Sequence, residues 1–97
     1  MNESEYLFEF IKLWKPTPSW RKRRDDGDFV LLSDEYLEIH YLNSTARDIL
    51  DLMNGKNVEE ICNAMHKIYA VDKEVLRKDI INTIRELQWN HLIRITN

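Results

Sequence analysis

The chain has 97 residues, of which 43% are hydrophobic and 32% are charged, and its formal net charge at pH 7 is −3. This length suits one domain with one modest core and leaves no room for a separate catalytic domain. The negative net charge argues against nucleic acid or an anionic membrane surface as a partner. A single cysteine excludes an intramolecular disulfide and fits a reducing compartment. The N-terminus is acidic and no apolar run approaches the roughly 20 residues of a membrane span, so we expect a cytoplasmic protein.

Residues 1–15 form an apolar N-terminal arm. Its hydrophobic side chains fit the spacing of a helix and also the alternation of a strand, so periodicity leaves both structures open. The arm either packs on its own domain or docks on a partner or a second copy, and docking on a second copy would make a homodimer. Pro16 and Pro18 end the arm, because each lacks a backbone donor and restricts the residue before it.

Three short strands are expected after the arm, over residues 19–24, 29–32 and 35–42, with tight turns between them. Such strands form an antiparallel meander, and one face of this meander needs a cover. The third strand alternates between two faces, one with Leu37, Ile39 and Tyr41, the other with Tyr36, Glu38 and His40.

The cover is predicted to be helical. A first helix starts at a cap on Asn43 or Ser44 and stops before Gly55, and a second opens at Asn57 with the spacing of a capping box. A third and longer helix runs from a cap at Asp72 to about residue 89, and residues 91–95 form a brief closing strand. The sequence therefore predicts an α+β fold, with a three-stranded antiparallel sheet followed by three helices.

The order and spacing of these residues resemble the PqqD-like family, whose members are also called recognition elements of ribosomally synthesised and modified peptides (RiPPs). The resemblance covers roughly residues 18–95, and it divides the chain into the arm (1–15) and a recognition domain (16–97). One departure is the segment 89–91, because the family often has a charged residue and a glycine there. The matching pieces are Leu42-Asn43-x-Thr45-Ala46-x-x-Ile49-Leu50-x-Leu52, Gly55, Val58-x-x-Ile61, Tyr69-x-Val71-Asp72, Asp79-Ile80, Leu87 and Leu92-Ile93.

The resemblance implies a winged helix-turn-helix-like fold with no catalysis and no cofactor of its own. It also implies a role: members grip the leader region of a precursor peptide and present its core to a modifying enzyme. The leader adds as a strand to the edge of the third strand, beside the third helix. The family suggests a radical-SAM maturase as the enzyme, and its iron–sulfur clusters would be its own, since one cysteine cannot ligate a cluster.

An exposed strand edge offers unpaired N–H and C=O groups that an extended peptide satisfies. Ordering each peptide residue costs about 1–2 kcal/mol and each backbone hydrogen bond returns about 0.5–1.5 kcal/mol, so apolar anchors must supply the affinity. Successive residues of a helix are rotated by about 100°, so the residues of the third helix can be assigned to a core face and to two flanks beside it. We hypothesise that Ile81 and Ile84 on one flank line the leader groove with Gln88, while Arg77 and Arg85 pair with acidic leader residues. The alternative interpretation is that Ile81 is an extra core residue and that the arginines form a solvated face. The alternative groove is the opposite flank, at Asp79, Thr83 and Glu86.

Other functions receive less support from the residues. A winged-helix DNA-binding regulator shares this architecture, but the third helix balances its cations against as many carboxylates, which suits phosphates poorly. The basic run of residues 21–24 is followed at once by acidic residues and is interpreted as a solvated strand. Cys62 and His66 share a helix face without further ligands, so we expect no metal site. No phosphate-binding glycine loop is present in a sequence with two glycines.

Overall fold

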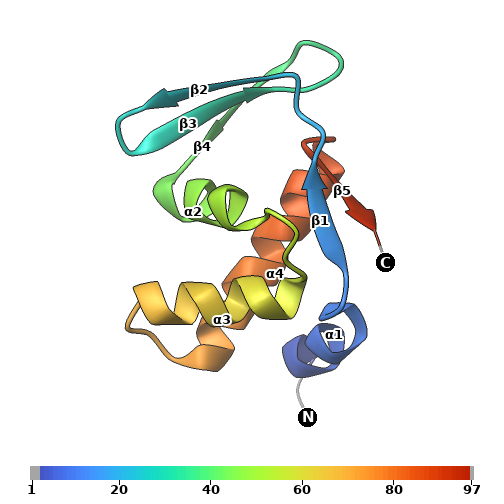
Figure 1. Cartoon of the computed structure of the whole chain (residues 1–97), viewed down its shortest axis with the longest axis vertical. Coiled ribbons are helices and arrows are strands. Elements are labelled where there is room, and N and C mark those ends of the chain that lie inside the picture. Colours follow the sequence, from blue (N-terminus) through green and yellow to red (C-terminus); the bar gives the residue numbers. More distant parts are fainter. Residues whose placement is uncertain (1–2, 97) are drawn as a thin grey trace.

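The computed structural model describes residues 3–96, and side chains from Tyr6 onward. Residues 1, 2 and 97, which belong to the predicted arm and domain, lie outside the described residues. The elements are α1 (Glu3–Ile11), β1 (Lys15–Pro18), β2 (Lys22–Asp26), β3 (Phe29–Ser33), β4 (Ile39–Leu42), α2 (Ser44–Leu52), α3 (Val58–Ile68), α4 (Lys73–Trp89) and β5 (Ile93–Thr96). Figure 1 shows the sheet of β2, β3 and β4 at one end of the molecule, with α1 and α3 at the other. The predicted fold class is confirmed.

The three-stranded sheet has the order β2-β3-β4 and is antiparallel throughout. Gly27 takes a φ of 64° in the turn between β2 and β3, a conformation that glycine adopts without a steric penalty. Val30 and Leu32 in the central strand are fully buried and face the helices, so this face of the sheet is the one that is covered. As expected, β4 lies at an edge, because only one of its sides is paired.

The third strand is shorter than predicted. Residues 35–38, which the alternation predicts as part of the strand, form a turn with Asp34, and β4 begins only at Ile39. Asp34 closes this turn: its N–H donates to the carbonyl of Glu38 at 3.0 Å, and its carbonyl accepts from the N–H of Leu37 at 3.1 Å. Leu37 takes a φ of 65° there, which no strand residue has. Tyr36, Leu37 and Glu38 therefore lie outside the strand.

The three helices after the sheet begin at the predicted caps. The Asn43 side chain accepts from the N–H of Ala46 at 3.0 Å, and Asn57 forms a complete capping box with Glu60. Asp72 accepts from the N–H of Glu74 at 2.9 Å. The apolar faces of the helices meet in one core, in which Ile49, Ile61 and Ile80 are fully buried. Among the described residues, we find no helix with both the length and the apolar character needed to span a bilayer.

The N-terminal arm is a helix followed by a strand. Helix α1 ends at Ile11 and buries Phe8 and Ile11 in the core, against α4, so the arm packs on its own domain. The two prolines lie within β1, which pairs antiparallel with β5, with Pro16 opposite Ile95 and Pro18 opposite Ile93. This second, two-stranded sheet joins the N-terminal and C-terminal segments, as Figure 1 shows. The closing strand was predicted, but its pairing with the proline segment was not.

Candidate functional site

The free edge of β4 is the first part of the candidate site. In an antiparallel ladder, hydrogen-bonded pairs alternate with pairs that are not hydrogen-bonded. Asp34 and Glu38 are hydrogen-bonded, so the next pair, Ser33 and Ile39, is not. The backbone groups of His40 and Leu42 are therefore directed to β3. Those of Ile39 and Tyr41 are directed to the open side, where they are available to a further strand.

The side chains of Ile39 and Tyr41 stand on the outer face of the sheet. They are 72% and 58% exposed, and the Tyr41 ring packs on Phe29 with centroids 4.9 Å apart. His40 and Leu42 point to the inner face and are half-buried. A strand added to this edge would thus place alternate side chains on the outer face and against the helices.

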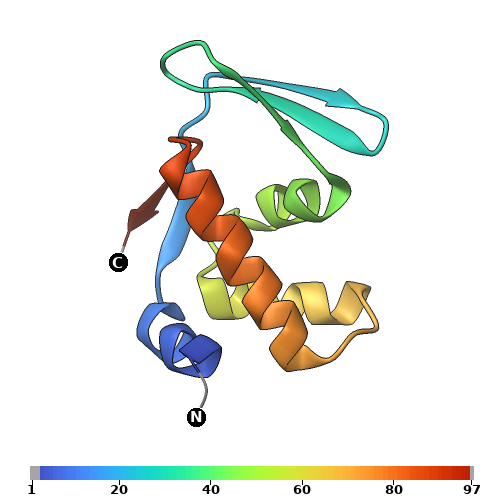
Figure 2. The same ribbon diagram turned by 180° about the vertical axis from the view of Figure 1, so that it is seen from behind.

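A slot lies between the end of β4 and helix α4. Its volume is about 130 Å³. Figure 2 shows α4 in the foreground and β4 leading into α2 beside it. Three elements supply its lining, which consists of Tyr41, Leu42, Asn43, Ala46, Thr83, Glu86 and Leu87. The α4 residues of this lining include Thr83 and Glu86, the flank that the sequence offered as the alternative groove. The sequence predicts a helix cap at Asn43 and a family match at Ala46, and nothing in their pattern signals a role in a slot.

The residues predicted to line the groove from α4 lie elsewhere. Ile81 and Ile84 are each 2% exposed and belong to the core, which corrects the expectation that they line an open groove. The guanidinium of Arg77 lies 4.1 Å above the centroid of the Phe8 ring, so this side chain faces α1 rather than β4. The arm, which lies outside the family pattern, therefore contacts the flank that the sequence favours at Arg77, in the first half of α4.

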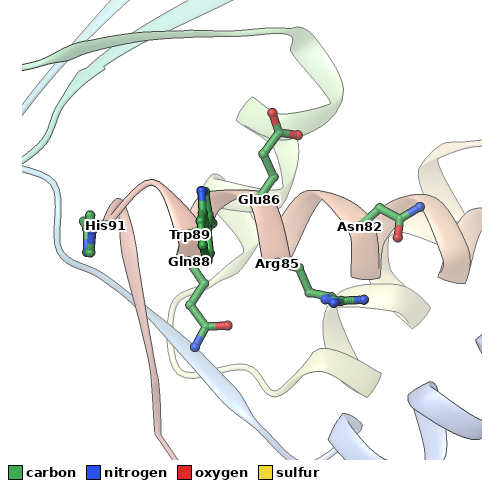
Figure 3. A pocket seen from close by; sticks show the side chains of 6 residues that line it. All are labelled: Asn82, Arg85, Glu86, Gln88, Trp89 and His91. Atoms are coloured by element: carbon green, nitrogen blue, oxygen red, sulfur yellow. The ribbon is translucent and has the colours of Figure 1, made fainter.

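Arg85 and Gln88 are exposed but project away from the sheet. Figure 3 shows both side chains directed to the opposite side of α4 from Glu86. They line a wide hollow of about 940 Å³ along the outer surface of α4, together with Asn82, Glu86, Trp89 and His91. All of these except His91 belong to one helix, and no strand edge adjoins them in the lining. Trp89, which is 84% exposed, is a candidate contact that the sequence left unassigned.

The turn before β4 positions the start of the free edge. One Asp34 oxygen accepts from the N–H groups of Tyr36 at 2.8 Å and Glu38 at 3.0 Å, and the other lies 2.9 Å from His40 Nε2. The hydrogen bond from His40 is the main cause that lowers the pKa of Asp34 below its ordinary value of 3.8. The Tyr36 and His91 rings meet at a steep angle, with centroids 5.6 Å apart, so the turn contacts the segment that follows α4.

The acidic groups and the cysteine fit structural roles. Asp34, Glu38 and His40 place potential ligand atoms within 4.8 Å of one another, yet both Asp34 oxygens already hold the turn together. Cys62 is buried, and its burial raises the pKa of the thiol to about 11, which disfavours a reactive thiolate. The Tyr69 hydroxyl donates to Asp48, and this hydrogen bond raises the pKa of the phenol.

The basic run of residues 21–24 lies at the start of β2, on the far edge of the sheet from β4. Arg23 is engaged within the fold: its guanidinium lies 2.9 Å from Asp25 and 2.8 Å from Asp51 on α2. These carboxylates and the acidic turn that follows reduce the positive field expected of a phosphate-binding surface. The arrangement agrees with a solvated strand.

Comparisons with known proteins identify the family and the fold. The family model described as coenzyme PQQ synthesis protein D (PqqD) matches residues 28–93, which is more than half of the chain. A solved structure titled "TbiB1 in Complex with the TbiA(beta) Leader Peptide" superposes with a TM-score of 0.69 at 25% sequence identity, over 75% of this chain and 87% of that one. No curated protein matches the chain. The chain belongs to the PqqD family, whose members bind peptides and catalyse no reaction of their own.

Proposed function

We propose that this chain binds the leader region of a ribosomally made precursor peptide by strand addition at the free edge of β4. The observation that carries the proposal is the unpaired edge at Ile39 and Tyr41, beside a slot on α4. The likeness to TbiB1, which is described in complex with a leader peptide, supports it. The peptide backbone would continue the β2-β3-β4 ladder, and its inward side chains would meet Leu42, Thr83 and Leu87.

The backbone bonds at this edge orient the leader more than they hold it. Each backbone hydrogen bond contributes about 0.5–1.5 kcal/mol net to binding. Ordering one peptide residue costs about 1–2 kcal/mol, so the two terms roughly cancel. An apolar side chain buried in the slot adds about 1.5–3 kcal/mol. We therefore expect affinity to depend on one or two leader side chains that enter the slot, while the strand edge fixes their direction.

The bound peptide would be presented to a modifying enzyme, for which we propose a radical-SAM maturase. The family resemblance supports this class of enzyme. Cys62 is buried in the core of α3, so any iron–sulfur cluster in the assembly would be held by the enzyme.

For the homodimer we propose the outer face of α1. Tyr6 and Phe10 lie there about one helical turn apart, and Leu13 follows in the turn after α1. These side chains are 71%, 73% and 65% exposed, whereas Phe8 on the inner face is buried in the core. Sedimentation equilibrium over a wide concentration range tests this contact. Association of the wild type that Phe10→Ser abolishes supports it, and a monomer at all concentrations contradicts it.

A proline at Tyr41 tests the leader site. The N–H of Tyr41 is directed away from β3, so Tyr41→Pro removes a donor from the free edge and leaves the ladder intact. The matched control is Asp25→Pro, which occupies the equivalent outward position on the opposite edge, in β2. The ligand is the leader region of a precursor peptide encoded beside this chain, followed by isothermal titration.

We expect the wild type and Asp25→Pro to bind alike and Tyr41→Pro to bind about tenfold more weakly, a loss of about 1.4 kcal/mol that is within the range of one or two backbone bonds. Unchanged binding by Tyr41→Pro, with lost binding by Asp25→Pro, would move the site to β2. Wild type that binds none of the encoded leader regions would overturn the proposed function.

A further inference from the structure

We infer that the peptide recognised at this site carries a basic side chain, lysine or arginine, opposite Glu86. This inference rests on the proposed function, because it names the chemistry of the peptide that would occupy the slot beside β4. It reverses the charge expected from the sequence, in which arginines of the third helix were to meet acidic leader residues.

Glu86 is the charged side chain of the slot lining. It is exposed, Figure 3 shows it projecting from α4 on the side away from Arg85, and no described hydrogen bond or ion pair occupies its carboxylate. Its neighbours in the slot, Thr83, Leu87 and Leu42, are neutral. A peptide strand on the edge of β4 would therefore pass a carboxylate that pairs with no cation among the described residues.

A second carboxylate lies on the same flank of α4. Asp79 precedes Glu86 by seven residues, close to two helical turns, and is also exposed. The hydroxyl of Thr83, between the two, donates to the carbonyl of Asp79 at 2.9 Å and adds no charge. Both carboxylates contribute a negative potential along the side of the slot that faces the peptide.

Three arginines of α4 and α2 are directed away from this flank. Arg77 lies on the Phe8 ring, and Arg85 projects to the opposite side of α4. Arg47, on α2, donates to the carbonyl of Gly27 at 2.9 Å at the far end of the β2–β3 hairpin. The flank therefore attracts a basic leader side chain and repels an acidic one.

The size of the effect follows from exposure. A solvent-exposed ion pair contributes little, and a pair at the rim of a slot that the peptide partly desolvates contributes more. We expect neutralisation of Glu86 to weaken binding about three- to fivefold, and its reversal to lysine about tenfold. The effect should shrink as the salt concentration rises, because ions screen the pair.

The test is a selection from a phage-displayed library of random 12-residue peptides on the wild-type chain. Enriched peptides are synthesised with a fluorescent label, and their dissociation constants are measured by anisotropy. The variants are Glu86→Gln and Glu86→Lys, and the matched control is Arg85→Gln, which removes a charge from the other flank of the same helix. Each peptide is also made with its lysine or arginine replaced by glutamine.

The expected result is a basic residue at one fixed position of the enriched peptides and weaker binding to both Glu86 variants, with Arg85→Gln unchanged. With the peptide whose lysine or arginine is replaced by glutamine, Glu86→Gln should bind as tightly as wild type. This loss of the difference would show that the two charges interact. Enriched peptides without a basic preference, or equal binding by all variants, would overturn the inference and leave peptide binding standing. A selection that enriches no peptide would overturn the proposed function and the inference with it.

Discussion

The two flanks of helix α4 differ in what lies beside them. One flank is closed in its first half, where Arg77 packs on Phe8 of α1 and Ile81 is part of the core. The other flank carries Thr83 and Glu86 and borders the slot next to the unpaired edge of β4. Both flanks have the same helical periodicity, yet only one adjoins free backbone groups. The position of the neighbouring elements, and not the helix pattern, decides which flank can take a ligand.

The comparison also shows what the arm contributes. An isoleucine off the axis of the core face, such as Ile81, indicates either an exposed groove or a second packing partner. In this chain Ile81 is part of the core, and α1, which contacts α4 through Phe8 and Arg77, lies outside the family match at residues 28–93. The closed flank is thus specific to a chain that has this arm, and the open flank depends only on the matched part of the fold.

The largest expected effect is on the closed flank. Phe8→Ala removes a ring that is 3% exposed, so we expect the free energy of unfolding to fall by about 3–5 kcal/mol, measured by urea denaturation followed by circular dichroism. Phe10→Ala is the matched control, because this ring on the same helix is 73% exposed and should change stability by less than about 0.5 kcal/mol. Equal losses from the two variants would contradict an α1 that turns Phe8 to the core and Phe10 to solvent.

A smaller effect, dependent on pH, concerns the open side. The folded pKa of Asp34 lies below its ordinary value of 3.8, so its contribution to stability is present above that value and is lost as the pH falls through the folded pKa. We expect wild type to be more stable than Asp34→Asn near neutral pH, with the difference shrinking below about pH 4.

The measurement is the urea midpoint of both proteins between about pH 2 and pH 6, with Glu35→Gln, an exposed neighbour, as control. A constant difference between wild type and Asp34→Asn over the whole range would show that the Asp34 charge does not hold the turn. The late start of β4, at Ile39, would then need a cause other than this carboxylate.

The smallest stability effect is expected at Trp89. This side chain is 84% exposed, so Trp89→Ala should alter the free energy of unfolding by less than about 0.5 kcal/mol. Trp14 and Trp20 pack against the core, and we expect Trp89 to give most of the tryptophan fluorescence change when a peptide binds near α4. A variant that keeps the full change would place the peptide away from this helix.

The sequence predicts the elements whose signals are local. The caps at Asn43, Asn57 and Asp72 are found where the side-chain pattern placed them, because capping is decided within one helical turn. The turn at Gly27 follows from its freedom to take a positive φ. The fold class follows from the order of these signals along the chain.

Two features required contacts that a local pattern does not contain. Residues 35–38 alternate like a strand, but the side chain of Asp34 binds the backbone two and four residues ahead and closes a turn instead. Likewise, β1 pairs with a strand almost at the other end of the chain, and its prolines are tolerated there because β1 is an edge strand.

The end of α4 depends both on local hydrogen bonds and on a contact with a distant part of the chain. His91 takes a φ of 60°, its N–H donates to the carbonyl of Gln88, and the N–H of Leu92 donates to that of Leu87. These bonds define a Schellman motif, in which the left-handed position is usually glycine. Histidine occupies this left-handed position here, and its ring contact with Tyr36 ties the helix end to the turn before β4.

The brevity of β4 has a consequence for how a guest chain is aligned. A strand of four residues offers outward backbone groups at two positions, and a peptide shifted by two residues meets the same groups again. Main-chain pairing alone therefore allows several alignments, differing by steps of two residues. Under the proposed function, the choice among them falls to the leader side chain that fits beside α4, and that choice would set how far the rest of the precursor extends from the sheet edge.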